Sequence, residues 1–255
     1  MLKRVGLLAF AIAVAGAFAF PDAARFAAAK AGYAVCHQWP EHSFSVSSTV
    51  FPLCARCTGT YFAALFLLAF IWASGRARAG DWPAKPALVV LGVGFAAMAA
   101  DGINSFVDVI TAGQSHLYVP SNALRFVTGG FNGLALVSIG YPLLNSVLWK
   151  DWDSRPILRN AGETLGIAAL AGASLLVIEA AGALLPLFSL LSLAGILILF
   201  TGLNAALWLV LARRERRAES LRDALPALGA GLCMALAELL LTGLGRNALE
   251  SHLLR

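Results

Sequence analysis

The stretch Ser189–Leu211, SLLSLAGILILFTGLNAALWLVL, contains no charged residue and is long enough to cross a lipid bilayer as one helix. A hydrocarbon core needs roughly 20 apolar residues per spanning helix. Comparable blocks recur along the chain, and we predict seven spans in all, at Val5–Phe20, Thr58–Ser74, Ala87–Ala112, Asn122–Trp149, Thr164–Leu185, Ser189–Leu211 and Leu225–Leu244. The sequence therefore predicts an all-α fold, a polytopic transmembrane helical bundle.

The composition agrees with a membrane protein. Hydrophobic residues make up 59% of the 255 residues and charged residues only 13%, whereas a soluble domain has about 25% charged residues. The net charge of +5 comes from basic residues in short loops beside apolar blocks, where such residues set membrane orientation. We therefore expect membrane lipids as neighbours and no nucleic-acid partner. The sequence indicates no oligomeric state.

Every second loop is the more basic one, and the run Arg213, Arg214, Arg216 and Arg217 is the strongest example. Basic loops stay in the cytoplasm. We therefore expect a multi-pass protein of the bacterial cell (inner) membrane with a cytoplasmic N-terminus. The first span follows Lys3 and Arg4 and is either a signal anchor, which we favour, or a cleaved signal peptide.

This orientation divides the chain into four regions. They are a signal anchor or first transmembrane helix (1–20), an extracytoplasmic cysteine and histidine loop (21–57), a membrane core (58–149) and three further transmembrane helices (150–255). Two glycine pairs with small-xxx-small spacing, Gly129/Gly133 and Gly162/Gly166, suit close helix contacts; the alternative is chance, because Gly and Ala are frequent throughout the chain.

Three of the four cysteines lie in the extracytoplasmic loop, as Cys36 and the Cys-x-x-Cys pair Cys54 and Cys57. In a first interpretation they hold zinc or another transition metal, with His37 or His42 as the fourth ligand. In a second interpretation the Cys-x-x-Cys pair is a redox site that carries out thiol–disulfide exchange, with the third cysteine as its exchange partner. In a third a single disulfide stabilises the loop. We favour the metal site.

Two other features of the sulfur residues are simpler to interpret. Thr58 follows Cys57, so the histidine of a haem attachment motif is missing. Cys233 lies within the last span, and we expect it to be a small residue of the core.

Polar residues within the spans lie toward the same predicted side as the loop. Asp101, Asn104 and Asp108 share one helix face at i, i+3 and i+7. Arg125 is the expected partner of Asp101 or Asp108, because a buried charge needs a countercharge. We predict a pocket beneath the loop with Asp101, Asp108 and Arg125 as catalytic residues; a structural ion pair is the alternative. The other predicted pocket residues are Gln38, Arg56, Asn104, Asn122, Thr128, Glu179 and Glu238.

The strings Cys36-His37-Gln38 and Pro52-Leu53-Cys54-Ala55-Arg56-Cys57-Thr58-Gly59 resemble the membrane proteins of domain-of-unknown-function family 2085. Asp101 and the string around Arg125 and Thr128 also fit that family, so the resemblance covers residues 33–135. It implies a membrane core and no particular activity. The family usually has Arg at the position of His42, which favours His37 as the metal ligand.

Three functions remain open. The first is an enzyme acting on a lipid-linked or small-molecule substrate, in which Asp101 serves as general base and Arg125 holds a phosphate or carboxylate. The second is an ion or metal transporter, in which the intramembrane acids form the path. The third is a structural or assembly protein with a disulfide-stapled loop. We favour the first.

Overall fold

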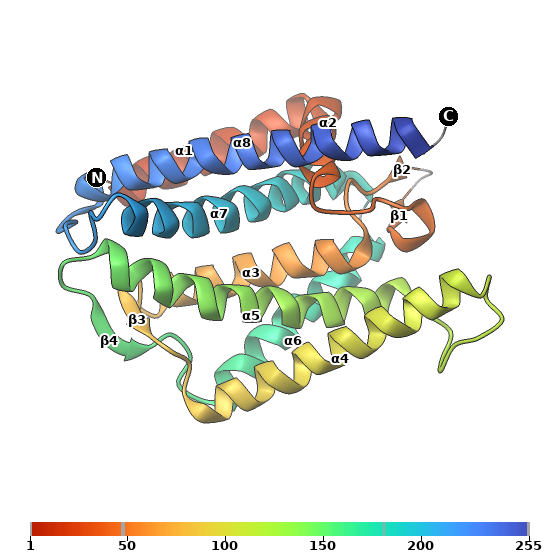
Figure 1. Ribbon diagram of the computed structural model, residues 1–255, viewed down its shortest axis with the longest axis horizontal. Helices are drawn as coiled ribbons and strands as arrows, with labels where there is room; N and C mark the ends of the chain where they lie inside the picture. Colours follow the sequence, from red (N-terminus) through yellow and green to blue (C-terminus); the bar gives the residue numbers. More distant parts are fainter. Residues whose placement is uncertain (1, 47–48, 181, 254–255) are drawn as a thin grey trace.

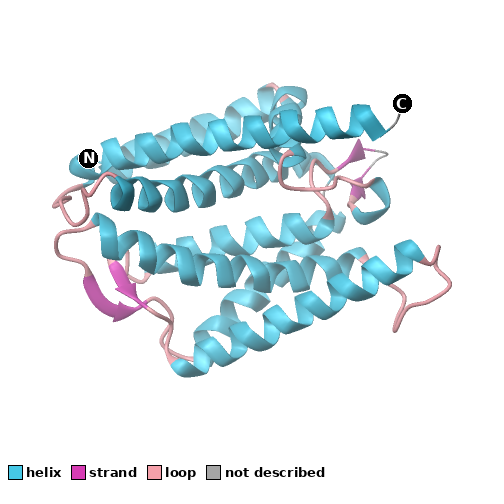
Figure 2. Cartoon of the chain, viewed as in Figure 1, coloured by secondary structure: helices cyan, strands magenta, loops and turns pink. Residues whose placement is uncertain are grey.

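A computed structural model describes residues 2–46, 49–180 and 182–253, leaving undescribed the side chains of residues 2–10, 179, 180 and 182. Within these residues the chain is a bundle of long helices, accompanied by two small two-stranded sheets. The long helices run roughly side by side, and short loops join them at the two ends (Figures 1 and 2). The predicted all-α helical bundle is confirmed.

The described elements follow in chain order. They are α1 (Leu2–Ala19), α2 (Pro21–Tyr33), η1 (Pro40–His42), β1 (Ser45–Val46), β2 (Thr49–Val50), α3 (Ala55–Ala73), β3 (Ala79–Asp81), α4 (Lys85–Ile110), α5 (Asn122–Leu148), β4 (Asp153–Pro156), α6 (Ala161–Ala180), η2 (Gly182–Leu184), α7 (Leu185–Leu211) and α8 (Leu221–Leu253). The helices α3 to α8 are each long and apolar enough to cross a membrane.

The first predicted span takes a different form from the others. The segments Ala11–Ala19 and Pro21–Tyr33 are bent by 106° against each other. Pro21 occupies the first position of α2. The lack of a backbone N–H is tolerated there, because the N–H groups of a first turn have no partner within the helix. Counted as one broken span, this pair brings the total from six to seven, in agreement with the predicted number.

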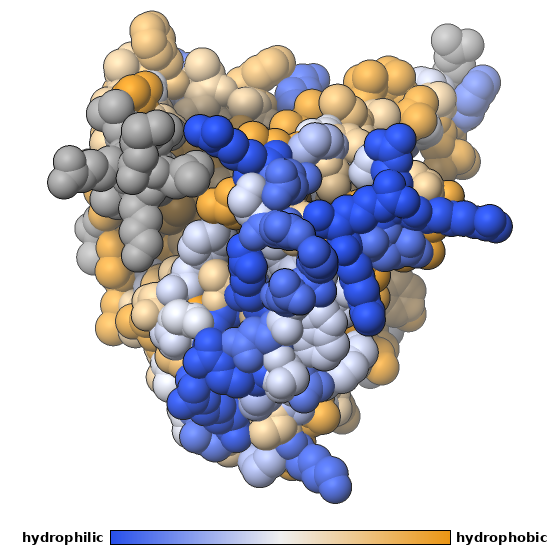
Figure 3. Space-filling view, turned by 90° about the vertical axis from the view of Figure 1, so that its left-hand side faces the viewer, coloured by the Kyte–Doolittle hydropathy of each residue, from blue (hydrophilic) through white to orange (hydrophobic). Residues whose placement is uncertain are grey.

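One end of the bundle carries the basic loops. The parallel pair β3–β4 lies there, and Figure 3 shows hydrophilic residues gathered over this end, with hydrophobic residues on the flanks. Arg76 is buried and donates to both carboxylate oxygens of Glu163 at 2.7 Å and to the carbonyl of Ile157 at 3.0 Å. This ion pair joins the loop after α3 to the start of α6.

Close contact between α3 and α5 organises the middle of the bundle. Added methyl groups at Gly129 and Gly133 would collide with the backbone carbonyls of Arg56 and Thr60, and the Thr60 hydroxyl donates to the Gly129 carbonyl at 3.0 Å. Small residues let spanning helices approach this closely. The contact predicted from Gly129 and Gly133 is confirmed.

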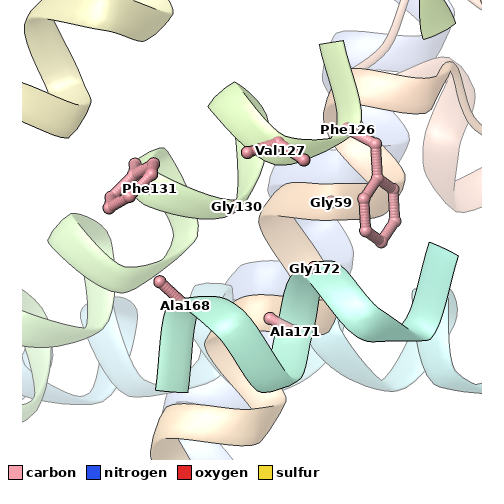
Figure 4. A pocket seen from close by; sticks show the side chains of 8 residues that line it. All are labelled: Gly59, Phe126, Val127, Gly130, Phe131, Ala168, Ala171 and Gly172. Atoms are coloured by element: carbon pink, nitrogen blue, oxygen red, sulfur yellow. The ribbon is translucent and has the colours of Figure 1, made fainter. Parts of the chain in front are cut away.

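The second predicted glycine contact is wrong. A methyl group at Gly166 would meet nothing within 4 Å, and one at Gly162 would approach only the Asn160 side chain at 3.2 Å. The two glycines do lie one helical turn apart, but the side of α6 that carries them faces no neighbouring helix. Small residues of α3, α5 and α6 do leave one apolar hollow, with a volume of about 10 Å³ (Figure 4), which is barely enough for one water molecule. Its lining contains no titratable or hydrogen-bonding side chain.

Candidate functional site

The three cysteines of the loop converge at the start of α3. Cys36 follows α2, Cys54 is the N-cap residue of α3, and Cys57 lies in its first turn. Their sulfur atoms all lie within 4.8 Å of one another, the only such group of three or more cysteine, histidine or acidic residues in the described part of the chain. Cys36 and Cys54 are buried. The structure therefore brings together the cysteine ligands that the sequence predicted.

The loop is held in place by Gln38. Its backbone adopts a φ of 57°, and its side-chain amide donates to the carbonyl of Ala29 at 2.9 Å and to that of Pro52 at 2.7 Å. The two arms of the loop are thereby tied together near the cysteines. Gln38 was predicted as a pocket residue, and the structure uses its side chain to shape the loop.

Hydrogen bonds favour a negative charge on the Cys36 sulfur. The pKa of Cys36 is lowered because the thiols of Cys54 and Cys57 donate to it, while burial opposes this shift. The backbone N–H of Cys54 also donates to the Cys36 sulfur, at 3.3 Å. Conversely, the bond to Cys36 raises the pKa of Cys54 to about 11. None of the three cysteines forms a disulfide. A single negative charge on the group is therefore favoured at the Cys36 sulfur, where the other two thiols stabilise it by hydrogen bonds.

The two histidines of the loop lie outside the sulfur group. The Nδ1 atom of His37 accepts the backbone N–H of Trp39 at 3.0 Å, and the rings of His37, Trp39 and His42 pack together with centroids 5.1 to 5.3 Å apart. Burial is the main reason why the pKa of both histidines is lowered. Neither histidine joins the cysteines as a fourth ligand among the described residues.

A second polar group surrounds Asp101 of α4, which is buried. Its carboxylate accepts hydrogen bonds from Arg56 at 2.5 Å, from Tyr118 at 3.0 Å and from Thr128 at 3.2 Å. The carboxylate is therefore fully engaged by hydrogen bonds. Sequence reasoning missed Tyr118, because a tyrosine in the loop between α4 and α5 has no spacing that points back to a residue of α4.

The predicted pairing of Arg125 with Asp101 or Asp108 is wrong. Arg56, in the first turn of α3, takes Asp101, and Asp108 pairs with His116 at 3.0 Å. Arg125 instead donates to the Asn122 side chain at 2.9 Å. The prediction considered only α4 and α5, whereas α3 packs against α5 closely enough to insert its own arginine.

Two asparagines predicted for the pocket bind backbone. Asn104 donates to the Tyr118 carbonyl at 2.9 Å and accepts the Leu117 N–H at 2.7 Å. It thereby folds the loop after α4 back toward Asp101. Asn122 donates to the carbonyls of Glu41 and Ser43 at 3.3 and 3.1 Å, which connects the start of α5 to the cysteine loop.

The remaining predicted residues lie elsewhere. Glu238 of α8 accepts a hydrogen bond from Asn204 of α7 at 2.9 Å, and the side chain of Glu179 is outside the described residues. Cys233 is exposed, so its expected place in the core is wrong. It lies on a face of α8 that turns away from the bundle and, in a bilayer, toward lipid.

The sulfur group and the Asp101 group occupy neighbouring faces of α3. Cys54, Cys57 and Tyr61 pack with Ile196 of α7 and Leu239 of α8. On the other face, Arg56 and Thr60 meet α4 and α5 through the bonds described above. Because successive residues of a helix are rotated by about 100°, the adjacent side chains of Arg56 and Cys57 contact different helices.

Comparisons with known proteins cover the part of the chain that builds both groups. Residues 36–139 match the model of a family described as "Predicted membrane protein (DUF2085)". An uncharacterized protein of Methanothermobacter thermautotrophicus is 29% identical over 116 residues, which are 45% of this chain and 91% of that protein. No solved structure matches. The segment with the cysteine loop, α3, α4 and most of α5 is therefore similar to a family of predicted membrane proteins, and the predicted resemblance to that family is confirmed.

Proposed function

We propose that this protein is a membrane metalloprotein of the bacterial inner membrane in which Cys36, Cys54 and Cys57 hold one thiophilic transition-metal ion, in the first place zinc. The observation that carries the proposal is the approach of three sulfur atoms to within 4.8 Å of one another. On a tetrahedral zinc ion with Zn–S bonds of about 2.3 Å, two sulfurs lie about 3.8 Å apart. A disulfide would join only two of the three sulfurs.

Three protein ligands suit an ion that also takes an exchangeable fourth ligand. Structural zinc sites are closed by four protein ligands, whereas catalytic sites keep one position for water or substrate. The activity that follows is hydrolysis or group transfer on a lipid-linked or small-molecule substrate that enters from the outer leaflet. The predicted general base, Asp101, is already engaged by three donors, which favours a structural role for it.

Transport of the metal is the second candidate function. The sulfur group packs against Leu239 of α8, and the next residue toward the N-terminus, Glu238, bonds Asn204 of α7. Polar side chains in a spanning pair of helices often mark an ion path. Metal uptake into proteoliposomes containing the purified chain distinguishes a transporter from an enzyme.

Elemental analysis of the purified protein tests the metal site. We expect about one ion per chain in the unmodified protein, and less than about one fifth of this amount in Cys36→Ser and Cys57→Ser, because each removes one of three ligands. The matched controls are Cys233→Ser, which alters the exposed cysteine, and His37→Ala, which alters the histidine outside the sulfur group. Both should retain the ion. Purified protein with no metal, whether its loop thiols are free or oxidised, would contradict the proposal.

A further inference from the structure

Arg125 is a buried cation whose hydrogen-bonding capacity is mostly unused. It is 5% exposed, and only its Nη1 atom makes a hydrogen bond, to the neutral side chain of Asn122. Its Nε atom is buried without a partner. In the described part of the chain no carboxylate lies within ion-pair distance of it. An arginine cannot release its proton to avoid the cost of burial.

The charged groups nearest to Arg125 include no bonded partner for its guanidinium. Arg56 lies near enough for its charge to act on Arg125, and its own Nε atom is also buried without a partner. Asp101 balances one of the two guanidinium groups, and the Asp108 carboxylate contacts the His116 ring at 3.0 Å and neither arginine. The pKa of His42 is lowered mainly by burial and, in addition, by the positive charge of Arg125. Arg125 therefore has no carboxylate bonded to it in the described part of the chain, and Asp101 and Asp108 act on it only from a greater distance.

The position of Arg125 within the fold suits the binding of a lipid headgroup. Arg125 lies in the first turns of α5, whose N-cap is Ser121, so the positive end of the helix dipole adds to its charge. The neighbouring loop exposes Leu117 (89%) and Val119 (76%). Apolar side chains so exposed beside a spanning helix belong in the bilayer. This placement of Leu117 and Val119 in the bilayer would put the guanidinium near the depth of the lipid phosphates.

We infer that Arg125, with Arg56 beside it, is a binding site for a phosphate-bearing anion. The arginine fork matches phosphate oxygens two at a time, and a phosphodiester supplies the single negative charge that pairs with one guanidinium. The ligand is either an anionic phospholipid headgroup or a free phosphate ester. The site lies where α3 meets α4 and α5, beside the face of α3 that carries the cysteines, and it shares no residue with the proposed metal site.

Thermal unfolding of the purified full chain in a neutral detergent tests this inference. The probes are phosphatidylglycerol and inorganic phosphate, each added over a concentration series, with native mass spectrometry to count bound lipid. The test variant is Arg125→Gln. The matched control is Arg222→Gln, because Arg222 is an exposed arginine at the start of α8, at the end of the bundle with the basic loops.

We expect phosphatidylglycerol to raise the unfolding midpoint of the unmodified chain and of Arg222→Gln, and to bind Arg125→Gln about tenfold more weakly. Stabilisation by the lipid alone identifies a lipid site, and stabilisation by inorganic phosphate as well identifies a site that accepts free phosphate. Stabilisation by neither probe would overturn the inference. So would an equal response of Arg125→Gln and the unmodified chain.

The stability without ligand provides a second criterion. Arg125→Gln removes a buried charge that has no bonded carboxylate, so in lipid-free detergent it should unfold at the same temperature as the unmodified chain or higher. A purely structural arginine would show the reverse, with a lower midpoint and no change in the lipid response. Should Arg125→Gln fail to fold, Arg125→Lys keeps the charge without the fork and should bind the lipid more weakly. Unchanged lipid binding by that variant would likewise overturn the inference. Metal content is measured separately, so failure of either site is distinguishable from failure of the other.

Discussion

Arg246, near the end of α8, donates a hydrogen bond of 2.6 Å to the backbone carbonyl of Cys36. The same guanidinium donates to the Tyr33 carbonyl at 2.9 Å and lies 4.2 Å from the centre of the Tyr33 ring. Glu250 completes the arrangement by accepting from Arg246 at 2.7 Å and from the Tyr33 hydroxyl at 2.6 Å. A helix outside the family match thus holds the loop that carries the first cysteine.

Replacing Arg246 by alanine should weaken metal binding. The carbonyls of Tyr33 and Cys36 would lose their donor, and the position of the Cys36 sulfur would become less well defined. Groups that support metal ligands from behind typically contribute a factor of about 10 to 100 in affinity; we expect about tenfold. Competition with a chromophoric chelator measures the change. Arg222→Ala is the control, and equal affinities of the two variants would show that α8 does not support the site.

Replacing Asp101 by asparagine should destabilise the bundle. Arg56 would lose its partner, and breaking a buried ion pair costs about 3 to 5 kcal/mol. The Arg56 side chain is 24% exposed, so solvent screens part of the interaction and we expect the lower end, about 3 kcal/mol. Unfolding of the purified protein by denaturant measures the loss. Asp151→Asn, an exposed site, should change nothing, and an equally stable Asp101→Asn would refute the structural role.

A methyl group on Gly133 should disturb the packing of α3 on α5. The new Cβ would meet the carbonyl oxygen of Thr60, and overpacking of this kind costs about 1 to 3 kcal/mol. Gly140→Ala, on the same helix, is the matched control because its Cβ would meet nothing within 4 Å. The measurement is the unfolding midpoint in detergent. A midpoint for Gly133→Ala as high as that of Gly140→Ala would show that the two helices can separate without loss.

The side of the membrane that faces the cysteine loop is testable with two single substitutions. Glu41 and Glu215 are both exposed, one in the cysteine loop and the other in the basic loop after α7. We expect Glu41→Cys to react with a membrane-impermeant maleimide in intact cells, and Glu215→Cys to react only after the cells are opened, because basic loops stay in the cytoplasm. The opposite pattern would invert the orientation and would place the sulfur group in the cytoplasm.

Several features of the site were accessible from local sequence alone. The spacing of Cys54 and Cys57 places both thiols in or beside one helical turn, and the i, i+3 relation of Asp101 and Asn104 places both on a buried face of α4. The glycines at 129 and 133 mark a contact surface for the same reason of periodicity. These relations depend only on the helix repeat, which the helix maintains whatever packs against it.

Other features required the packed bundle. Arg56 rather than Arg125 reaches Asp101, Cys233 faces outward, and Arg246 crosses from the end of α8 to the cysteine loop. Each depends on how one helix is rotated against another that is distant in the chain, and many rotations satisfy the same hydropathy. The sequence by itself determined that this is a membrane bundle with a cysteine loop, because burial in lipid requires long apolar runs that are visible locally. Only the tertiary structure decided which charges are paired and which remain free, because a buried charge is satisfied by whichever side chain the packing of the helices brings within reach.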